Sequence, residues 1–201
     1  QSVIEGLQDK SNVKVVAPRI QAFGMYAGAK DEAASGSFVG VDPEAEKNLT
    51  EMHKRVRKGR WLKNSREAVI GHRLAKELNL DVGGELLVVV NALDGSIGNQ
   101  VYPVVGIYNS GMLERDGGAM FPLQDAQELF AMGDGVHELV VLTQAEEKIE
   151  TVQNSTANAY PDLAVRTWYE ISPETKQMED LTAVTSFFFY FIIMAISGFM
   201  V

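Results

Sequence analysis

The chain has 201 residues, a length that suits one large domain or two small ones. Its 27 acidic and 18 basic residues give a net charge of −9, which argues against a protein that binds the phosphate backbone of nucleic acid. The absence of cysteine excludes disulfide bonds and thiolate metal sites, and it suits a bacterial periplasm. Because the first residue is Gln1 and no signal peptide follows, we expect an export signal either to be missing or to lie upstream.

The first quarter of the chain predicts two helices and two strands. Residues 1–10 have the pattern of the end of a helix, and residues 13–20 alternate as a strand that breaks at Pro18. A second short strand at 36–42 closes with Asp42, a residue suited to cap a helix that begins at the following proline.

Short strands and helices are clearer from residue 60 onwards. Asp94 and Gly95 mark the tip of a hairpin, and Pro103 predicts an edge or a strand start. Pro122 and Gly133 predict the start and the stop of a helix. The predicted elements are a strand at 66–71, a helix at 72–80, a strand at 85–90, a hairpin tip at 91–100, a strand at 101–108 and a strand running into a helix at 118–133.

The last third predicts a strand at 137–144, a helix at 145–159 and a strand at 163–169, where apolar and polar residues alternate. Strands and helices are mixed without regular βαβ alternation. This order favours an α+β fold over a doubly wound parallel sheet.

Motifs that would carry catalysis are missing from the sequence. There is no G-x-x-x-x-G-K-[ST] loop for a nucleotide and no G-x-S-x-G elbow for a nucleophile. His53, His72 and His137 lie far apart, with no H-E-x-x-H pair. We therefore predict no catalytic residue, no metal site and no cofactor within this chain.

One stretch is basic in an otherwise acidic chain, and two interpretations stay open for it. It fits a patch for lipid headgroups or an acidic partner, and it also fits a solvated strand edge that charge protects from aggregation. The candidate residues are Lys54, Arg55, Arg57, Lys58 and Arg60.

The C-terminal segment begins as a helix at Ser172–Pro173 and then loses all charge from Leu181 to Val201. Its 21 uncharged residues would span roughly 31 Å as a helix, about the thickness of the hydrocarbon core of a bilayer. A buried core helix is the alternative, but this run has no polar face. We expect a transmembrane helix that includes Leu181, Phe188, Ile192 and Val201. Few basic residues precede it, which favours a non-cytoplasmic domain.

Two long runs carry a family resemblance. They are GRWLKNSREAVIGHRLAKELNLDVGGELLVVV and YPVVGIYNSGMLERDGGAMFPLQDAQELF, and the second contains Asp116 and an F-P pair before a helix with glutamine. In this order they resemble the periplasmic domain of MacB/FtsX-type ABC transporter permeases, and most of all the lipoprotein-releasing, LolC/LolE-like permeases. The segment RTWYEISPE also resembles the entry to their second membrane helix.

The resemblance implies a domain on the periplasmic side of the bacterial inner membrane. A porter-like α/β subdomain would comprise residues 1–50 and 134–171, and a mostly-β, Sabre-like subdomain would be inserted at 51–133. Residues 172–201 would form the stalk and the start of the second transmembrane helix. ATP and magnesium would bind a separate ATPase, and the permease would pair with a second copy or a sister permease.

The resemblance also implies a periplasmic partner, which would be a chaperone, an adaptor or a hydrolase. In the lipoprotein-releasing branch a hairpin of the inserted subdomain grips a chaperone. The comparable hairpin here lacks Lys and Arg, so an ordinary exposed hairpin stays an alternative. Its candidate residues are Leu93, Asp94, Ile97, Asn99 and Gln100.

Three functions remain as hypotheses at this stage. The first is the non-catalytic domain of a permease that moves lipoproteins, lipids or other amphiphiles. The second is a membrane-anchored sensor or protein-binding module, which includes FtsX-like regulation of a cell-wall hydrolase. The third is an anchored hydrolase, for which the sequence offers no residues.

Overall fold

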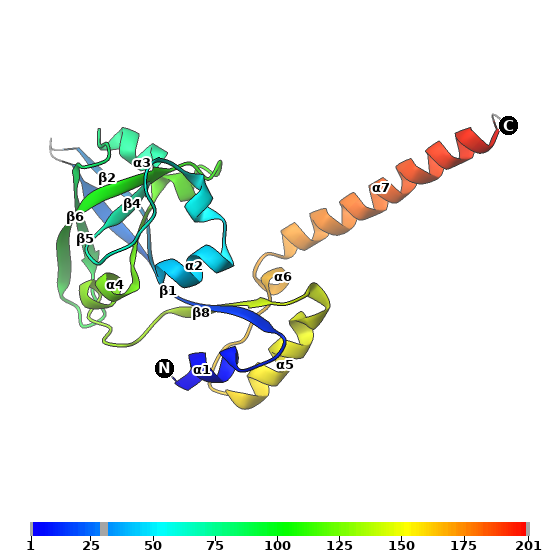
Figure 1. Ribbon diagram of the computed structural model, residues 1–201, viewed down its shortest axis with the longest axis horizontal. Helices are drawn as coiled ribbons and strands as arrows, with labels where there is room; N and C mark the ends of the chain where they lie inside the picture. Colours follow the sequence, from blue (N-terminus) through cyan, green and yellow to red (C-terminus); the bar gives the residue numbers. More distant parts are fainter. Residues whose placement is uncertain (1, 29–31, 200–201) are drawn as a thin grey trace. The chain divides into compact units, whose positions relative to one another are not determined.

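The computed structural model describes residues 2–28 and 32–199 of the chain (Figure 1). These residues fold as two compact units, Gln1–Gln144 and Ala145–Val201. The subdomain boundaries implied by the family resemblance, at residues 50, 133 and 171, stay a prediction.

The first unit contains all the strands of the described chain. The strands are β1 (Val13–Ala27), β2 (Ala33–Val41), β3 (Val56–Gly59), β4 (Ala68–Gly71), β5 (Glu85–Asn91), β6 (Ile97–Tyr108), β7 (Ala119–Pro122) and β8 (Glu138–Thr143). Its helices are α1 (Ser2–Gln8), α2 (Pro43–Leu49), α3 (His72–Glu77) and α4 (Leu123–Leu129), with short 3₁₀ turns η1 (Met52–Arg55) and η2 (Arg115–Gly117).

Most of these strands close into a barrel. The hydrogen-bonded order is β2-β7-β4-β6-β5-β1, and β1 also pairs with β2, so the path returns to its start. The pairs β2–β7 and β4–β6 are parallel, and the other pairs are antiparallel. β3 adds to β6, and β8 pairs with the first part of β1. This mixed order confirms the predicted α+β class.

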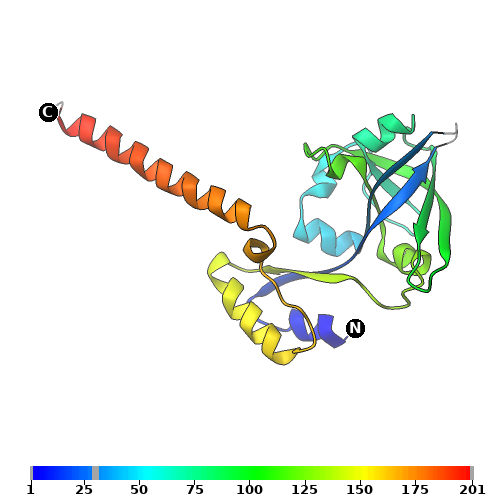
Figure 2. The same ribbon diagram turned by 180° about the vertical axis from the view of Figure 1, so that it is seen from behind.

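Aromatic side chains fill the barrel. The rings of Phe38 and Phe121 stack with centroids 4.3 Å apart, and Tyr102 lies 4.8 Å from Phe121. Each of these three residues is 2% exposed or less. Aromatic pairs of this kind each contribute about 0.5–1.5 kcal/mol beyond the area they bury. Figures 1 and 2 place α3 and α4 at opposite ends of the barrel, where both helices contribute side chains to this core.

Several local predictions for the first unit are confirmed. The Asp42 carboxylate accepts hydrogen bonds from the N–H groups of Glu44 and Ala45, each at 2.9 Å, and Pro43 is the first residue of α2. The strand at 66–71, the helix after it and the hairpin at 85–108 correspond to β4, α3 and the β5–β6 pair. The predicted Asp94–Gly95 tip lies between β5 and β6.

Both proline predictions are wrong. β1 runs through Pro18 to Ala27, because pairing with β2 starts only at Arg19 and the missing N–H costs no bond on that side. β6 is an inner strand although it contains Pro103. Its pairing with β4 begins at the next residue, Val104, so the proline again faces no partner on that side.

The helix that follows β7 stops before Gly133. It ends at Leu129, and Ala131 takes a positive φ of 54°. The N–H groups of Ala131 and Met132 donate to the carbonyl oxygens of Glu128 and Gln127, at 3.2 and 2.9 Å. This is the Schellman pattern of a helix C-terminus, formed here without glycine.

The second unit is helical. It contains η3 (Glu146–Lys148), α5 (Ile149–Ala159), α6 (Trp168–Ile171) and α7 (Pro173–Phe199). The strand predicted at 163–169 is wrong, since the described part of this segment forms no ladder and enters α6. Thr167 and Glu170 form a capping box that starts this helix, and Gln153 of α5 donates to the Glu170 carboxylate at 3.0 Å.

The helix predicted from Pro173 is confirmed as α7, a continuous helix in Figure 2. The structure does not support the membrane-crossing part of that prediction. Within residues 2–28 and 32–199, no helix has both the length and the apolar character that a membrane span needs. The first half of α7 holds polar side chains such as Thr182 and Thr185, whose hydroxyls bond to backbone carbonyl oxygens at 2.8 Å.

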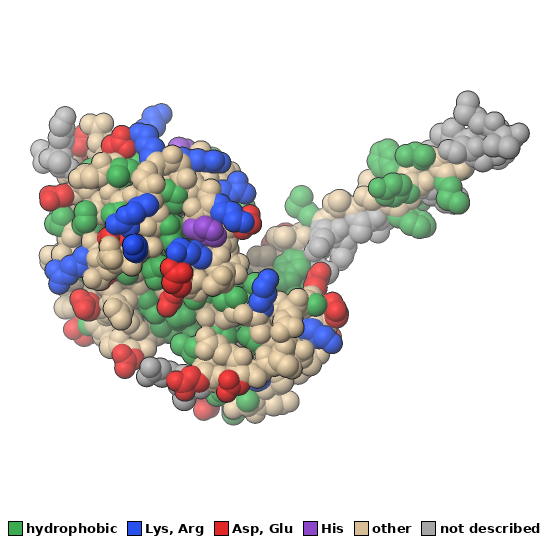
Figure 3. All heavy atoms as spheres, in the orientation of Figure 1, with side chains coloured by type: hydrophobic (Ala, Val, Ile, Leu, Met, Phe, Trp, Pro, Cys, Tyr) green, Lys and Arg blue, Asp and Glu red, His purple; other side chains and the backbone are tan. Residues whose placement is uncertain are grey.

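Apolar side chains of α7 are nevertheless exposed (Figure 3). Leu181 is 68% exposed and Phe188 is 59% exposed. Val201 lies outside the described residues, and the side chain of Ile192 is not among those described.

Candidate functional site

The predicted hairpin forms a well-defined tip with an apolar outer face. Asp94 holds the turn by accepting hydrogen bonds from the N–H and the hydroxyl of Ser96, at 2.9 and 2.6 Å, and these bonds lower the pKa of its carboxyl group. Leu93 and Ile97 are each 67% exposed. Exposed apolar side chains also occupy facing positions further along the strands, at Leu87 and Val101. Clustered apolar exposure of this kind is typical of contact surfaces.

The hairpin is fixed against the end of α4 by close backbone contact. A Cβ atom on Gly98 would lie 2.2 Å from the carbonyl oxygen of Leu129, so only glycine permits this approach. The Leu93 N–H donates to the carbonyl oxygen of Phe130 at 3.1 Å. The tip is therefore held by the barrel instead of projecting freely.

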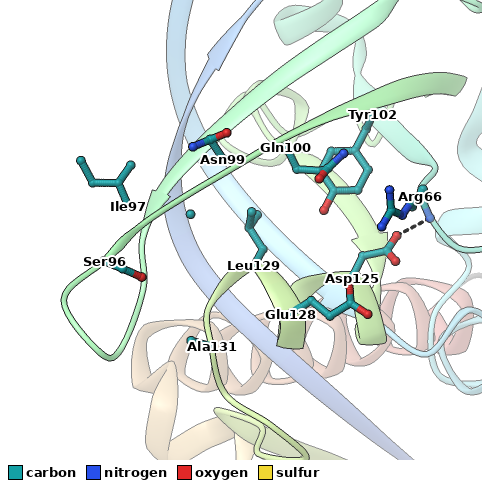
Figure 4. A pocket seen from close by; sticks show the side chains of 11 residues that line it. Arg66, Ser96, Ile97, Asn99, Gln100, Tyr102, Asp125, Glu128, Leu129 and Ala131 are labelled. Atoms are coloured by element: carbon teal, nitrogen blue, oxygen red, sulfur yellow. Dashed lines mark hydrogen bonds between the residues drawn. The ribbon is translucent and has the colours of Figure 1, made fainter.

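A pocket of about 310 Å³ lies where the hairpin meets α4 (Figure 4). β6, α4 and the segment before β4 all contribute to it, and Figure 4 shows the Tyr102 ring between β6 and α4. The lining residues are Arg66, Ser96, Ile97, Gly98, Asn99, Gln100, Tyr102, Asp125, Glu128, Leu129 and Ala131.

Three of the five predicted hairpin residues, Ile97, Asn99 and Gln100, line this pocket. Leu93 and Asp94 do not, because they form the turn beyond it. The sequence did not single out Arg66, Tyr102, Asp125 or Glu128. For Asp125 and Glu128 the one sequence signal was the F-P pair before their helix, and that signal came from the family resemblance.

The pocket is acidic, and one of its two carboxylates is buried. Asp125 is 5% exposed and accepts a hydrogen bond from the Arg66 N–H at 2.5 Å. Burial raises the pKa of Asp125, and the negative charges of Glu128 and Glu67 add to this effect. Burial, together with the charges of Asp125 and Glu128, also raises the pKa of Tyr102 well above its ordinary value.

The predicted basic residues lie around β3, which among the described strands pairs only with β6. Most of their charge is matched locally. Lys54 pairs with Glu51 at 2.5 Å, Lys58 pairs with Asp81 at 2.7 Å, and Arg60 pairs with Glu67. Within the described residues, Arg55 and Arg57 form no ion pair, so these two carry the unmatched charge of the patch. Its role, as a partner surface or as a protected strand edge, stays a prediction.

Glu67 anchors the segment that follows this patch. Its carboxylate accepts hydrogen bonds from Arg60, from the Lys63 N–H at 3.1 Å and from the Asn64 side chain at 2.9 Å. The bond from Arg60 is the main reason that the pKa of Glu67 falls to about 2. Asp116 is also buried, and it holds Ser110 through two bonds of 2.8 Å and His72 at 3.1 Å. These two acids stabilise loops.

A metal site finds no support in the described part of the chain. No group of three or more His, Asp or Glu side chains there is placed to hold a metal ion. The arrangement offers a rigid hairpin, an apolar outer face and a small acidic pocket.

Known proteins share this fold. The extracellular domain of a noncanonic ABC-type transporter, YknZ from Gram-positive bacteria, matches with a TM-score of 0.64 and 17% identity over 81% of this chain and 82% of that one. The periplasmic region of MacB from Actinobacillus actinomycetemcomitans gives 0.58 and 11% identity over 80% and 73%. A domain of a putative permease protein from Porphyromonas gingivalis gives 0.53 and 12% over 84% and 77%.

No curated protein matches the chain in sequence. The profile of the MacB-like periplasmic core domain, however, matches residues 2–159, most of the chain. The chain therefore belongs to the MacB-like periplasmic core domain family and is the periplasmic domain of a MacB/FtsX-type ABC transporter permease.

Proposed function

We propose that this domain passes ATP-driven motion to a periplasmic protein or cargo, in the export of lipoproteins, lipids or other amphiphiles. The observation that carries the proposal is the hairpin of this permease domain, which presents exposed apolar side chains beside a preformed pocket. The family is not an enzyme family, so the domain acts by binding and by changing position.

ATP and magnesium bind a separate ATPase in this proposal, and no cofactor binds this chain. The permease works as a pair, with a second copy or a sister permease. Helix α7 supplies a stiff connector, since it has 27 residues and its single proline is at the first position. At 1.5 Å per residue it extends about 40 Å. A helix without an internal break transmits a displacement along its axis with little bending.

The hairpin is the contact point for the partner in this proposal. Leu93 and Ile97 give it an apolar tip, and the bond from Leu93 to Phe130 together with the Gly98 contact keeps the tip in place. A preorganised apolar surface loses little entropy on binding. The partner is a chaperone, an adaptor or a hydrolase, and each corresponds to one branch of the superfamily.

Site-specific photocrosslinking in the full-length permease, in membranes with its ATPase, tests the proposal. A photoreactive residue at Asn99 reports on the hairpin, and one at Arg57 reports on the basic patch. Lys76 in α3, exposed at the opposite end of the barrel, is the matched control. We expect a specific partner at Asn99, absent at Lys76, whose crosslinking yield changes when the ATPase is inactivated.

The identity of the captured protein separates the branches. A lipoprotein chaperone supports release of lipoproteins, an adaptor supports export through a tunnel, and a cell-wall hydrolase supports FtsX-like regulation without transport. If Asn99 and Lys76 give the same products, or if the ATPase has no influence on the yield, the proposal is wrong.

A further inference from the structure

The pocket beside the hairpin is lined by a tyrosine whose ring is covered and whose hydroxyl has no hydrogen-bond partner in the described residues. Tyr102 is 2% exposed, its hydroxyl makes no hydrogen bond within the described residues, and the residue lines the pocket. Figure 4 shows its ring pointing from β6 towards α4, into the space that the pocket occupies. The ring is covered while the hydroxyl is open to the pocket, so a group that enters the pocket can form a hydrogen bond with it.

The two carboxylates of the pocket also form no ion pair within the described residues. Asp125 and Glu128 are three residues apart on α4, so both carboxylates lie on the same side of the helix. Arg66 is the single cationic residue of the lining, and it forms no ion pair within the described residues. Asp125 accepts one backbone N–H, and a carboxylate has room for further donors. Two carboxylates thus face one guanidinium that pairs with neither, so the pocket can take a further cation that donates hydrogen bonds.

The size of the pocket limits what enters it. At about 310 Å³ it stands at the lower end of ligand sites and has room for one long side chain. Leu129 and the Tyr102 ring form an apolar wall next to the carboxylates. An apolar wall beside acidic groups suits an aliphatic stem that ends in a cation.

We infer that this pocket receives one lysine or arginine side chain of the protein that docks on the hairpin. The ammonium or guanidinium group lies between Asp125 and Glu128 and donates a hydrogen bond to the Tyr102 hydroxyl. The stem lies against Leu129. Gln100, which also lines the pocket, offers a further acceptor. The origin of this side chain in a partner protein rests on the proposed function, whereas the preference for a cation rests on the pocket alone.

The test measures binding of small probes to the 201-residue chain by ¹H–¹⁵N NMR. The probes are N-acetyl-lysine methylamide and N-acetyl-arginine methylamide, and N-acetyl-norleucine methylamide is the neutral control of similar shape. We expect saturable shifts at residues 97–102 and 125–131 for the cationic probes, with a Kd on the order of 1–10 mM, as befits ligands of this size. The two cationic probes show which side chain fits better. Equal shifts with the norleucine probe, or no saturable shifts with either cation, overturn the inference.

Two variants and one control locate the binding. Glu128→Gln removes an exposed charge and leaves the helix intact, and Tyr102→Phe removes only the hydroxyl. We expect affinity to fall about tenfold for Glu128→Gln and about threefold for Tyr102→Phe, as for the loss of a charge-assisted and of a neutral hydrogen bond. Glu85→Gln makes the same charge change on β5, outside the pocket, and leaves affinity unchanged. If all three variants bind equally well, the cation binds elsewhere and the inference fails.

The crosslinking experiment tests the proposed function, and the binding experiment tests the cation preference of the pocket, so either claim can be wrong without the other. A partner captured at Asn99 together with a pocket that ignores cations leaves the proposed function standing and removes the cationic anchor. If the pocket binds cations but no partner is captured at Asn99, the cation preference of the pocket stands and the proposed role of the hairpin is wrong.

Discussion

Glu67 and Asp125 are both buried carboxylates of the first unit, yet their surroundings shift their pKa values in opposite directions. Glu67 is surrounded by donors from residues 60–64, and the pKa of its carboxyl falls to about 2. Asp125 receives one N–H group, from Arg66, and burial raises its pKa. The carboxylate that stabilises the fold finds its partners within its own segment, whereas the one at the pocket forms no ion pair within the described residues. The difference separates a structural region from a binding region.

The largest effect is expected from Glu67→Ala. The change leaves the donors of Arg60, Lys63 and Asn64 without their acceptor, and we expect the free energy of unfolding to fall by about 2–3 kcal/mol, at the lower end for a buried pair because Arg60 is half exposed. Urea unfolding followed by tryptophan fluorescence measures it. Lys58→Ala breaks an exposed ion pair of the same segment and is expected to leave the midpoint unchanged. A small loss for Glu67→Ala would remove the contrast between the two acids.

A glycine pair on the hairpin tests whether the pocket is rigid. Gly98→Ala places a Cβ against the Leu129 carbonyl oxygen, and we expect a loss of about 2 kcal/mol as the hairpin moves away from α4. Gly95→Ala has open space around it and a φ of +82°, so it costs only about 1 kcal/mol of backbone strain. The decisive measurement is cation binding, which Gly98→Ala weakens and Gly95→Ala leaves unchanged. Equal binding by both variants would show that the contact does not shape the pocket.

The smallest effect, and the most diagnostic, concerns pH. For Glu67 the folded pKa is depressed, so its stabilisation is complete above the ordinary value of 4.5 and is lost as the pH falls towards about 2. For Asp125 the folded pKa is raised, so ionisation opposes folding at neutral pH, and this penalty disappears as the pH falls through that pKa.

Asp125→Asn is therefore expected to raise the free energy of unfolding at pH 7 by on the order of 1 kcal/mol, as for replacement of a poorly paired buried charge. The gain shrinks as the pH falls. Urea unfolding at a series of pH values measures it, and Glu67→Gln is the control, which loses stability at pH 7 and converges with the natural protein in acid. A large loss of stability in Asp125→Asn at pH 7 would contradict the assignment of Asp125 to the pocket.

Local sequence predicted the hairpin, including three residues that line the pocket, but it did not predict the side of the pocket that lies across from the hairpin. The turn is defined locally, because the Asp94 carboxylate accepts a hydrogen bond from the Ser96 N–H and Gly95 takes a positive φ. Neighbouring residues in the sequence are therefore enough to predict it. Arg66, Tyr102 and Asp125 meet only because the barrel closes, and no local pattern records that closure. Gly98 is a signal in the sequence that could have predicted a contact at this place, since glycine inside a strand often marks a close backbone approach.

The errors have similar causes. Alternation at 163–169 predicted a strand, but a strand needs a partner ladder, and the Thr167–Glu170 capping box instead starts a helix there. Pro18 and Pro103 were given too much weight, because a proline interrupts a sheet only where its N–H would face another strand.

The pairing of β1 with β8 has a mechanical consequence. The two strands are antiparallel, and Val13, the first residue of β1, pairs with Thr143, the last residue of β8. The chain thus enters and leaves this ladder at neighbouring points. A force that pulls these two points apart breaks the ladder bonds one at a time, in unzipping geometry. A force that moves both together loads all the bonds at once and is carried along β1 into the wall of the barrel. The ladder would therefore yield to separation and resist a joint push.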